Sequence, residues 1–118
     1  MEEHLMALLK GLGYPVSWGS MGPGAQLPRI VVQTVSGSQN VVLEGAVDKE
    51  TARIQVDSYG AADFSALTVS RAVRDLLSGY AGGPVTFTRM IAKRTRSEKS
   101  GDDLVPCVSQ DFEINYRL

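Results

Sequence analysis

The chain has 118 residues, of which 43% are hydrophobic and 21% are charged, and its formal net charge is −1. These values are typical of one folded domain and exclude an intrinsically disordered chain. The near balance of charge also argues against a nucleic-acid-binding module, which usually carries a marked basic excess.

The cysteine content and the apolar runs limit the setting in which the protein works. Cys107 is the only cysteine, so no intramolecular disulfide can form and no CxxC metal knuckle is present. The first residues, MEEHLMALLKGLG, do not resemble a signal peptide, because two acids precede a short apolar run that contains a lysine. No apolar run approaches the roughly 20 residues that a membrane span requires, so we expect no membrane association.

The N-terminal third predicts a short helix, an edge strand, a loop and a longer strand. Leucines at helical spacing and the glycines that follow them predict a helix over about residues 2 to 11. Residues 14 to 18 suit a short strand, which Pro15 confines to an edge or a strand start. Glycines and prolines make residues 19 to 28 a loop, and the β-branched residues 29 to 36 predict the next strand.

A clean alternation of apolar and polar residues marks residues 51 to 59, TARIQVDSY, as a strand with one face toward a core. Its polar members Arg53, Gln55 and Asp57 should point away from that core, to solvent or to a subunit contact. Ser58 should lie on the inner face and hydrogen-bond back to the chain near the next helix. This strand and the preceding one make a natural antiparallel pair joined by an extended loop.

After Gly60 the apolar period changes from two residues to about 3.6, which predicts the longest helix of the chain over about residues 62 to 78. Asp63 suits its first turn, where a carboxylate is favoured by the helix dipole. Two further strands follow, one over about residues 85 to 91 and one over about residues 108 to 116. Polar residues alternate along the last strand, as expected for a sheet with one wet face.

These elements predict a single α+β domain over residues 1 to 118, in the order helix, strand, strand, strand, helix, strand, strand. The expected sheet has about four strands and is antiparallel, or mixed at most. The long helix and the short N-terminal helix should pack on one of its faces. Two polar segments, at about residues 37 to 49 and 94 to 103, are expected as projecting loops because they exceed tight turns in length, although the second could instead extend its strands.

No set of residues predicts catalysis. His4 is the only histidine and lies near the terminus, so a surface or half-packed position is expected. No other histidine could serve as the base for a serine or cysteine nucleophile. Cys107 follows a proline at a strand start, where a buried structural thiol is the usual case. Asp57 and Ser58 have no second carboxylate or histidine placed to assist them, so we expect a scaffold role.

The segment near residues 94 to 103 carries mixed charge. Its bases are Lys93, Arg94, Arg96 and Lys99, and its acids are Glu98, Asp102 and Asp103. The acids lack the alternating ligand spacing of a calcium loop, so no metal is expected. No aromatic residue lies among the bases to stack on nucleotides, so docking on a neighbouring protein is favoured over sequence-specific binding of nucleic acid.

Three segments together resemble the small tail-completion, or tail-terminator, proteins of long-tailed bacteriophages and related particles. They are LPRIVVQTVSG (residues 27 to 37), ARIQVDSYG followed by a helix (52 to 60), and VSQDFEINYRL (108 to 118). The family pattern is a short helix, a loop ending in Leu-Pro, two strands, a long helix and a C-terminal strand of Asp-Phe-x-hydrophobic-x-Tyr type. The order and spacing of the segments carry the resemblance, which covers nearly the whole chain.

The resemblance implies a structural virion protein without cofactors or catalytic residues. Family members form a ring, commonly a hexamer, at the head-proximal end of the tail tube. The ring stops tube polymerisation and offers the surface for head-tail joining. The implied partners are further copies of the chain, the tail tube protein and a head-completion or neck protein. The implied location is the neck end of the virion tail, after synthesis in the host bacterial cytoplasm.

The surfaces that would contact such partners are the outward face of the strand over residues 51 to 59 and the mixed-charge segment. The expected interface residues are Arg53, Gln55, Asp57, Lys93, Arg94, Arg96, Glu98, Lys99, Asp102 and Asp103. Two other functions stay open. One is another neck component, such as a head-completion or connector protein. The other is a small ligand-binding domain, for which a deep pocket lined by Asp57, Cys107 and His4 would be expected.

Overall fold

The computed structural model describes the backbone of residues 1–19, 26–42, 45–100 and 103–117, and the side chains of residues 1–19, 26–35, 50–98 and 104–117. The elements in chain order are α1 (Glu2–Lys10), β1 (Val16–Trp18), β2 (Arg29–Val42), β3 (Gly45–Tyr59), α2 (Asp63–Leu77), β4 (Val85–Ser100) and β5 (Asp103–Arg117). Both helices therefore lie where the leucine and valine periodicities predict them, and the order of helices and strands is confirmed.

The described strands form one mixed sheet of five, in the order β1-β2-β3-β5-β4. The prediction of a sheet of about four strands, antiparallel or mixed at most, is right in part, because the sheet is mixed but has five strands. β1 pairs in parallel with β2, and the other neighbouring pairs are antiparallel. A parallel neighbour needs a connection that returns the chain to the same end of the sheet, and residues 20–25 of the segment between β1 and β2 lie outside the described residues.

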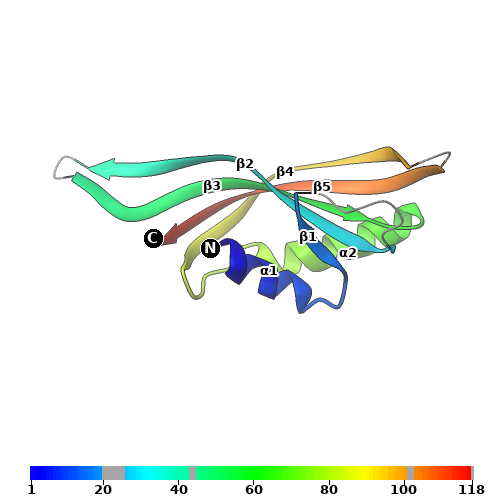
Figure 1. Ribbon diagram of the computed structural model, residues 1–118, viewed down its shortest axis with the longest axis horizontal. Helices are drawn as coiled ribbons and strands as arrows, with labels where there is room; N and C mark the ends of the chain where they lie inside the picture. Colours follow the sequence, from blue (N-terminus) through cyan, green and yellow to red (C-terminus); the bar gives the residue numbers. More distant parts are fainter. Residues whose placement is uncertain (20–25, 43–44, 101–102, 118) are drawn as a thin grey trace.

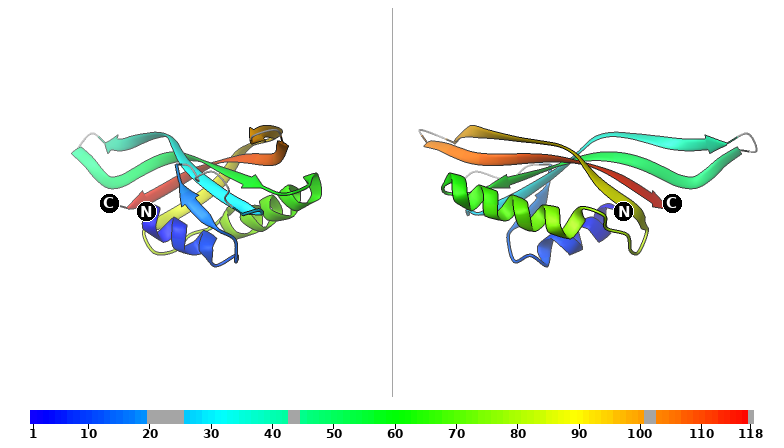
Figure 2. Two further views of the ribbon diagram at one scale, coloured as in Figure 1. Left: turned by 45° about the vertical axis from the view of Figure 1, so that its right-hand side comes forward. Right: turned by 180° about the vertical axis from the view of Figure 1, so that it is seen from behind.

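Both helices cover the same face of the sheet (Figures 1 and 2), as the sequence predicts. The apolar stripes of α1 and α2 pack on the inward side chains of β2, β3 and β5. The fully or nearly fully buried members of this core are Leu5, Leu9, Ile30, Val32, Ile54, Val56, Val69, Val73, Leu77, Val85, Phe112 and Ile114. Burial of each such side chain contributes roughly 1.5–3 kcal/mol, so this layer is the main source of stability.

The turn from β3 into α2 depends on Gly60. A Cβ at this position would lie 2.4 Å from the backbone nitrogen of Ala66 and 2.6 Å from Cβ of Ser65, both in the first turns of α2. Only glycine allows the strand end to pass this close to the helix. Ser58, just before this turn, is buried on the inner face as predicted, but its hydroxyl makes no hydrogen bond within the described residues, so the predicted bond to the chain is absent.

The two segments expected as loops are largely strand: for residues 37 to 49 this corrects the expectation, and for residues 94 to 103 it is the alternative in which the segment extends its strands. The ladder between β2 and β3 continues outward to the pair Val42–Gly45, and the ladder between β4 and β5 continues to the pair Ser100–Asp103. Figure 1 shows the two hairpins running past the helices in opposite directions. We call them the β2–β3 arm and the β4–β5 arm. The molecule is correspondingly elongated, with extents of 56 × 22 × 22 Å.

Candidate functional site

The candidate site is the sheet face opposite the helices, which we call the polar face. Strand alternation places the apolar side chains of β3 in the core and leaves Arg53, Gln55 and Asp57 on the other side. The pairing register then brings residues of β5 and β4 beside them, because Gln55 lies opposite Asp111 and Asp57 lies opposite Ser109. Arg94 in turn lies opposite Ser109.

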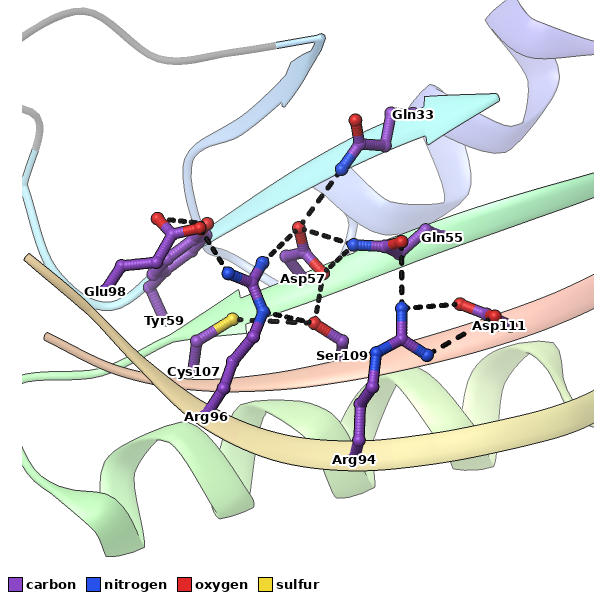
Figure 3. Close-up of polar contacts among 10 residues, drawn as sticks. All are labelled: Gln33, Gln55, Asp57, Tyr59, Arg94, Arg96, Glu98, Cys107, Ser109 and Asp111. Carbon is purple, nitrogen blue, oxygen red and sulfur yellow. Dashed lines mark hydrogen bonds and ion pairs between the residues drawn. The ribbon is translucent and has the colours of Figure 1, made fainter. Parts of the chain in front are cut away.

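Asp57 is the centre of a hydrogen-bond network on this face (Figure 3) and is only 2% exposed. Its carboxylate accepts hydrogen bonds from Ser109 Oγ at 2.6 Å, from Gln55 Nε2 at 2.9 and 3.1 Å, and from Gln33 Nε2 at 3.4 Å. Arg96 Nη2 forms an ion pair with it at 3.1 Å. Exposure to solvent, one of the two expectations for Asp57, is therefore wrong, because Arg96 reaches across β5 and covers the carboxylate.

Arg96 connects β4 to β5, through Ser109, and to β3, through Asp57. Its Nε donates to Ser109 Oγ at 3.0 Å, and its Nη1 donates to the carboxylate of Glu98. Glu98 also accepts a hydrogen bond from the hydroxyl of Tyr59, at 2.8 Å, which adds a second link from β4 to β3. A charge held by several such partners in a partly buried site is well compensated for its loss of water.

The pKa values follow from these contacts. Burial alone would lower the pKa of Arg96, but the hydrogen bond to Glu98 and the nearby negative charges raise it, so Arg96 stays protonated. Burial alone would raise the pKa of Glu98, but the hydrogen bonds from Tyr59 and Arg96 lower it overall. Burial and the bond to Glu98 raise the pKa of Tyr59. Arg96 and Glu98 are therefore a fixed ion pair at neutral pH, and neither is available for proton transfer.

Asp111 is a second buried carboxylate on the same face, with a side chain that is 6% exposed. Arg53 Nη2 pairs with it at 2.9 Å, and Arg94 Nη1 lies 3.4 Å from the same oxygen. Arg94 also donates from Nη2 to Gln55 Oε1 at 3.0 Å, which links this group to the Asp57 network. Strands β2, β3, β4 and β5 thus supply one connected polar layer, as Figure 3 shows.

Cys107 belongs to a small apolar cluster at the end of this layer. It is buried with Val31, Tyr59 and Val105. Burial raises the pKa of its thiol, and the charge of Asp57 raises it further. Nucleophilic cysteines need a lowered pKa, so this environment is the opposite of a catalytic one.

A depression of about 220 Å³ lies at this end of the polar face. Its walls are Gly19, Arg29, Val31, Gln33, Asp57, Tyr59 and Glu98. The carboxylates of Asp57 and Glu98 are both held by Arg96, so neither is free to act as a base. Among the described residues, no group of histidine, cysteine and acidic side chains is arranged to hold a metal ion.

The structure does not form a pocket from Asp57, Cys107 and His4. His4 lies on α1, on the helix side of the sheet, where its Nε2 is 2.7 Å from the hydroxyl of Tyr80. Asp57 and Cys107 lie on the other side. The pocket that a small ligand-binding domain would need from these residues is therefore not built.

The structure brings together six of the ten expected interface residues on the polar face: Arg53, Gln55, Asp57, Arg94, Arg96 and Glu98. Lys93 is exposed and lies opposite Gln110, on the helix side of β4. Lys99 and Asp103 have described backbone in β4 and β5, but their side chains lie outside the described set. Asp102 lies outside the described residues.

Sequence reasoning missed Ser109, Asp111, Gln33 and Tyr59 as members of the network. The alternation along the last strand indicates that Asp111 shares a face with the other polar residues, but it does not identify partners. Partner choice depends on the register of β3 against β5 and on the irregularity between Met90 and Ala92 in β4. No feature of the sequence alone gives either.

In the part of the chain that the structure describes, neither helix is both long and apolar enough to cross a membrane. A family model described as "Tail completion protein gp17" matches residues 2–117. No curated protein matches the sequence. Among solved structures, a chain of the "Virion of native gene transfer agent (GTA) particle" is similar with a TM-score of 0.59 and 16% identity, covering 97% of this chain and 84% of that chain. That similarity concerns the fold, because the identity is low.

Proposed function

The chain belongs to the tail completion protein family and is a structural protein of the virion tail rather than an enzyme, and from this premise we propose that it closes a tail tube. In this proposal, identical copies form a ring, with six copies as the expected number. The ring sits on the head-proximal end of the tube of a phage or gene-transfer-type particle, stops further polymerisation, and provides the surface that joins the head.

The observation that carries the proposal is the family match over residues 2–117. The chemistry of the polar face agrees with it. Its buried acids are neutralised by arginines, and its cysteine has a raised pKa. Such a face is suited to holding a shape and contacting a partner, not to turning over a substrate.

The arms suggest how one copy would reach the next. A head-to-tail interface closes into a ring when its rotation divides the circle. The two arms leave the molecule in opposite directions, so in a ring each copy could contact both neighbours (Figure 2). A two-stranded hairpin is only marginally stable when isolated in water, so partner contacts would stabilise the ends of the arms.

A shortened β4–β5 arm tests this role. Glu98 and Val105 are Cα partners, so residues 99–104 can be replaced by Asn-Gly without changing the register of the remaining ladder. We expect this variant to fold, since it keeps Glu98 and the core, but to give tails that are uncapped or of irregular length. The control is Arg71→Ala on the exposed side of α2. Normal, capped tails from the shortened variant would contradict the role of the arm.

A further inference from the structure

The two arginines that share Asp111 form a group with unbalanced charge at the centre of the polar face. Arg53 comes from β3, Arg94 from β4 and Asp111 from β5, so the group spans three paired strands. Two guanidinium groups meet one carboxylate. We call these three residues the Arg53–Arg94 clamp.

The carboxylate of Asp111 is buried, and the guanidinium groups of Arg53 and Arg94 are partly exposed. The Asp111 side chain is 6% exposed, whereas those of Arg53 and Arg94 are 44% and 46% exposed. Among the described contacts, Arg53 uses only Nη2, which leaves Nε and Nη1 free to donate. An approaching group therefore meets N–H donors rather than the buried acid.

The clamp is already ordered before any partner arrives. Asp111 fixes both guanidinium groups, and Gln55 accepts a further hydrogen bond from Arg94. Ordering a long side chain on binding has an entropic cost, and here most of that cost falls on folding instead. Forked guanidinium donors also match the two oxygens of a carboxylate.

The surroundings favour acidic side chains of a protein over nucleic acid. The other charged side chains of this region are close to balance: Arg89 pairs with Glu113, and Arg96 pairs with Asp57 and Glu98, with Arg29 nearby. About one positive charge is left, at the clamp. Nucleic acid would need an extended basic track to gain affinity from many phosphates.

We propose that the Arg53–Arg94 clamp is a docking site for an aspartate or glutamate side chain presented by a protein partner. The inference rests on the proposed function only in taking that partner to be another virion protein, which would include a second copy of this chain. In an assembly the clamp would set the register of the partner and the salt sensitivity of the contact.

The test uses purified full-length protein and a fluorescein-labelled octaglutamate peptide, followed by fluorescence anisotropy. Loss of both arginines alone would leave Asp111 buried without a partner and could unfold the protein. The test variant is therefore R53Q/R94Q/D111N, which changes the net charge by −1. Arg71→Gln on the exposed side of α2 makes the same net change and is the matched control.

We expect the wild type and R71Q to bind the peptide equally, with affinity falling as salt rises, and R53Q/R94Q/D111N to bind about tenfold more weakly. Circular dichroism and the urea midpoint establish that the variants are folded. A labelled DNA duplex of similar charge should bind more weakly than the peptide and without dependence on the clamp.

Three results would overturn the inference: no binding of octaglutamate by the wild type, equal loss in R71Q and the triple variant, or clamp-dependent binding of duplex that exceeds binding of the peptide. Peptide binding is measured on the free protein. A failure here would thus leave tail capping untouched, and a failure of capping with intact peptide binding would count against the proposed function alone.

Discussion

At the scale of single residues, the unusual feature is the burial of two carboxylates on the face that the helices leave uncovered. Asp57 and Asp111 are both nearly inaccessible, and each is neutralised by arginine from another strand of the sheet. A buried ion pair contributes little net stability compared with apolar packing, but removing one partner is costly because the other remains buried. These residues therefore fix the relative positions of β3, β5 and β4.

Asp57→Ala tests the importance of the central carboxylate. The change removes the acceptor for Ser109, Gln55 and Arg96 and leaves a partly buried guanidinium with less compensation. We expect the free energy of unfolding to fall by about 3–5 kcal/mol, measured by urea denaturation. The control is Asp75→Ala, whose side chain is 71% exposed and should change stability by less than about 0.5 kcal/mol. Equal effects of the two changes would contradict the network.

Tyr116 gives a prediction about alkaline pH. Its hydroxyl donates to the carboxylate of Glu50, and that bond, with burial, raises the pKa of Tyr116 to about 12. The phenol of the unfolded chain ionises near its ordinary pKa of about 10, so the contribution of Tyr116 is complete below that pH and is lost as pH rises toward 12. The stability difference between wild type and Tyr116→Phe should therefore shrink from about pH 10 to about pH 12, measured by urea midpoints. A constant difference would show that the phenol titrates normally.

At the scale of elements, β3 has the central place in the chain. Its inner side chains enter the core, its outer side chains build the polar layer, and its end passes directly into α2 through Gly60. The close approach of this turn to Ser65 and Ala66 explains why a residue without a side chain is present. The element thus joins the packing layer to the candidate interface.

Gly60→Ala should strain this turn, because the added Cβ would meet backbone atoms that cannot move without shifting α2. We expect a loss of about 1–3 kcal/mol in the free energy of unfolding, as for other overpacked sites. Ala61→Ser in the same turn, where the side chain is exposed, should be close to neutral. An unchanged urea midpoint for Gly60→Ala would contradict the tight approach.

The order of elements could be predicted from the sequence because the apolar residues of each helix and of most strands recur with a clear period. The helix over Asp63–Leu77 and the alternation in TARIQVDSY are examples. The β2–β3 arm could not, since residues 37 to 49 mix polar, apolar and glycine residues without a sustained alternation and so indicate a loop. Pairing with a neighbouring strand, which is a tertiary effect, makes them strands.

The sequence predicts on which face of the sheet the site residues lie, but not which residues they contact. Alternation places Arg53, Gln55 and Asp57 on the outer side of one strand, and this is confirmed. It cannot indicate that Arg96, far along the chain, covers Asp57, because that contact depends on strand order and on an irregular register in β4. Burial of Asp57 was therefore not accessible to sequence reasoning.

At the scale of the whole molecule, an elongated sheet carries two arms, one helical layer and one polar face. Stability resides in the centre, where the helices cover the sheet. The polar face is the side of the sheet that the helices leave uncovered. This division suits a subunit whose work consists of contacts with neighbours, as membership of the tail completion family requires.

The measurement that tests the central proposal most directly is electron microscopy of tail tubes polymerised with and without the purified protein. We expect a ring of this protein at one end of each tube and an arrest of growth from that end. The shortened-arm variant should not bind to the tubes. Tubes that continue to grow from both ends, or binding only to heads that lack tails, would contradict the proposal.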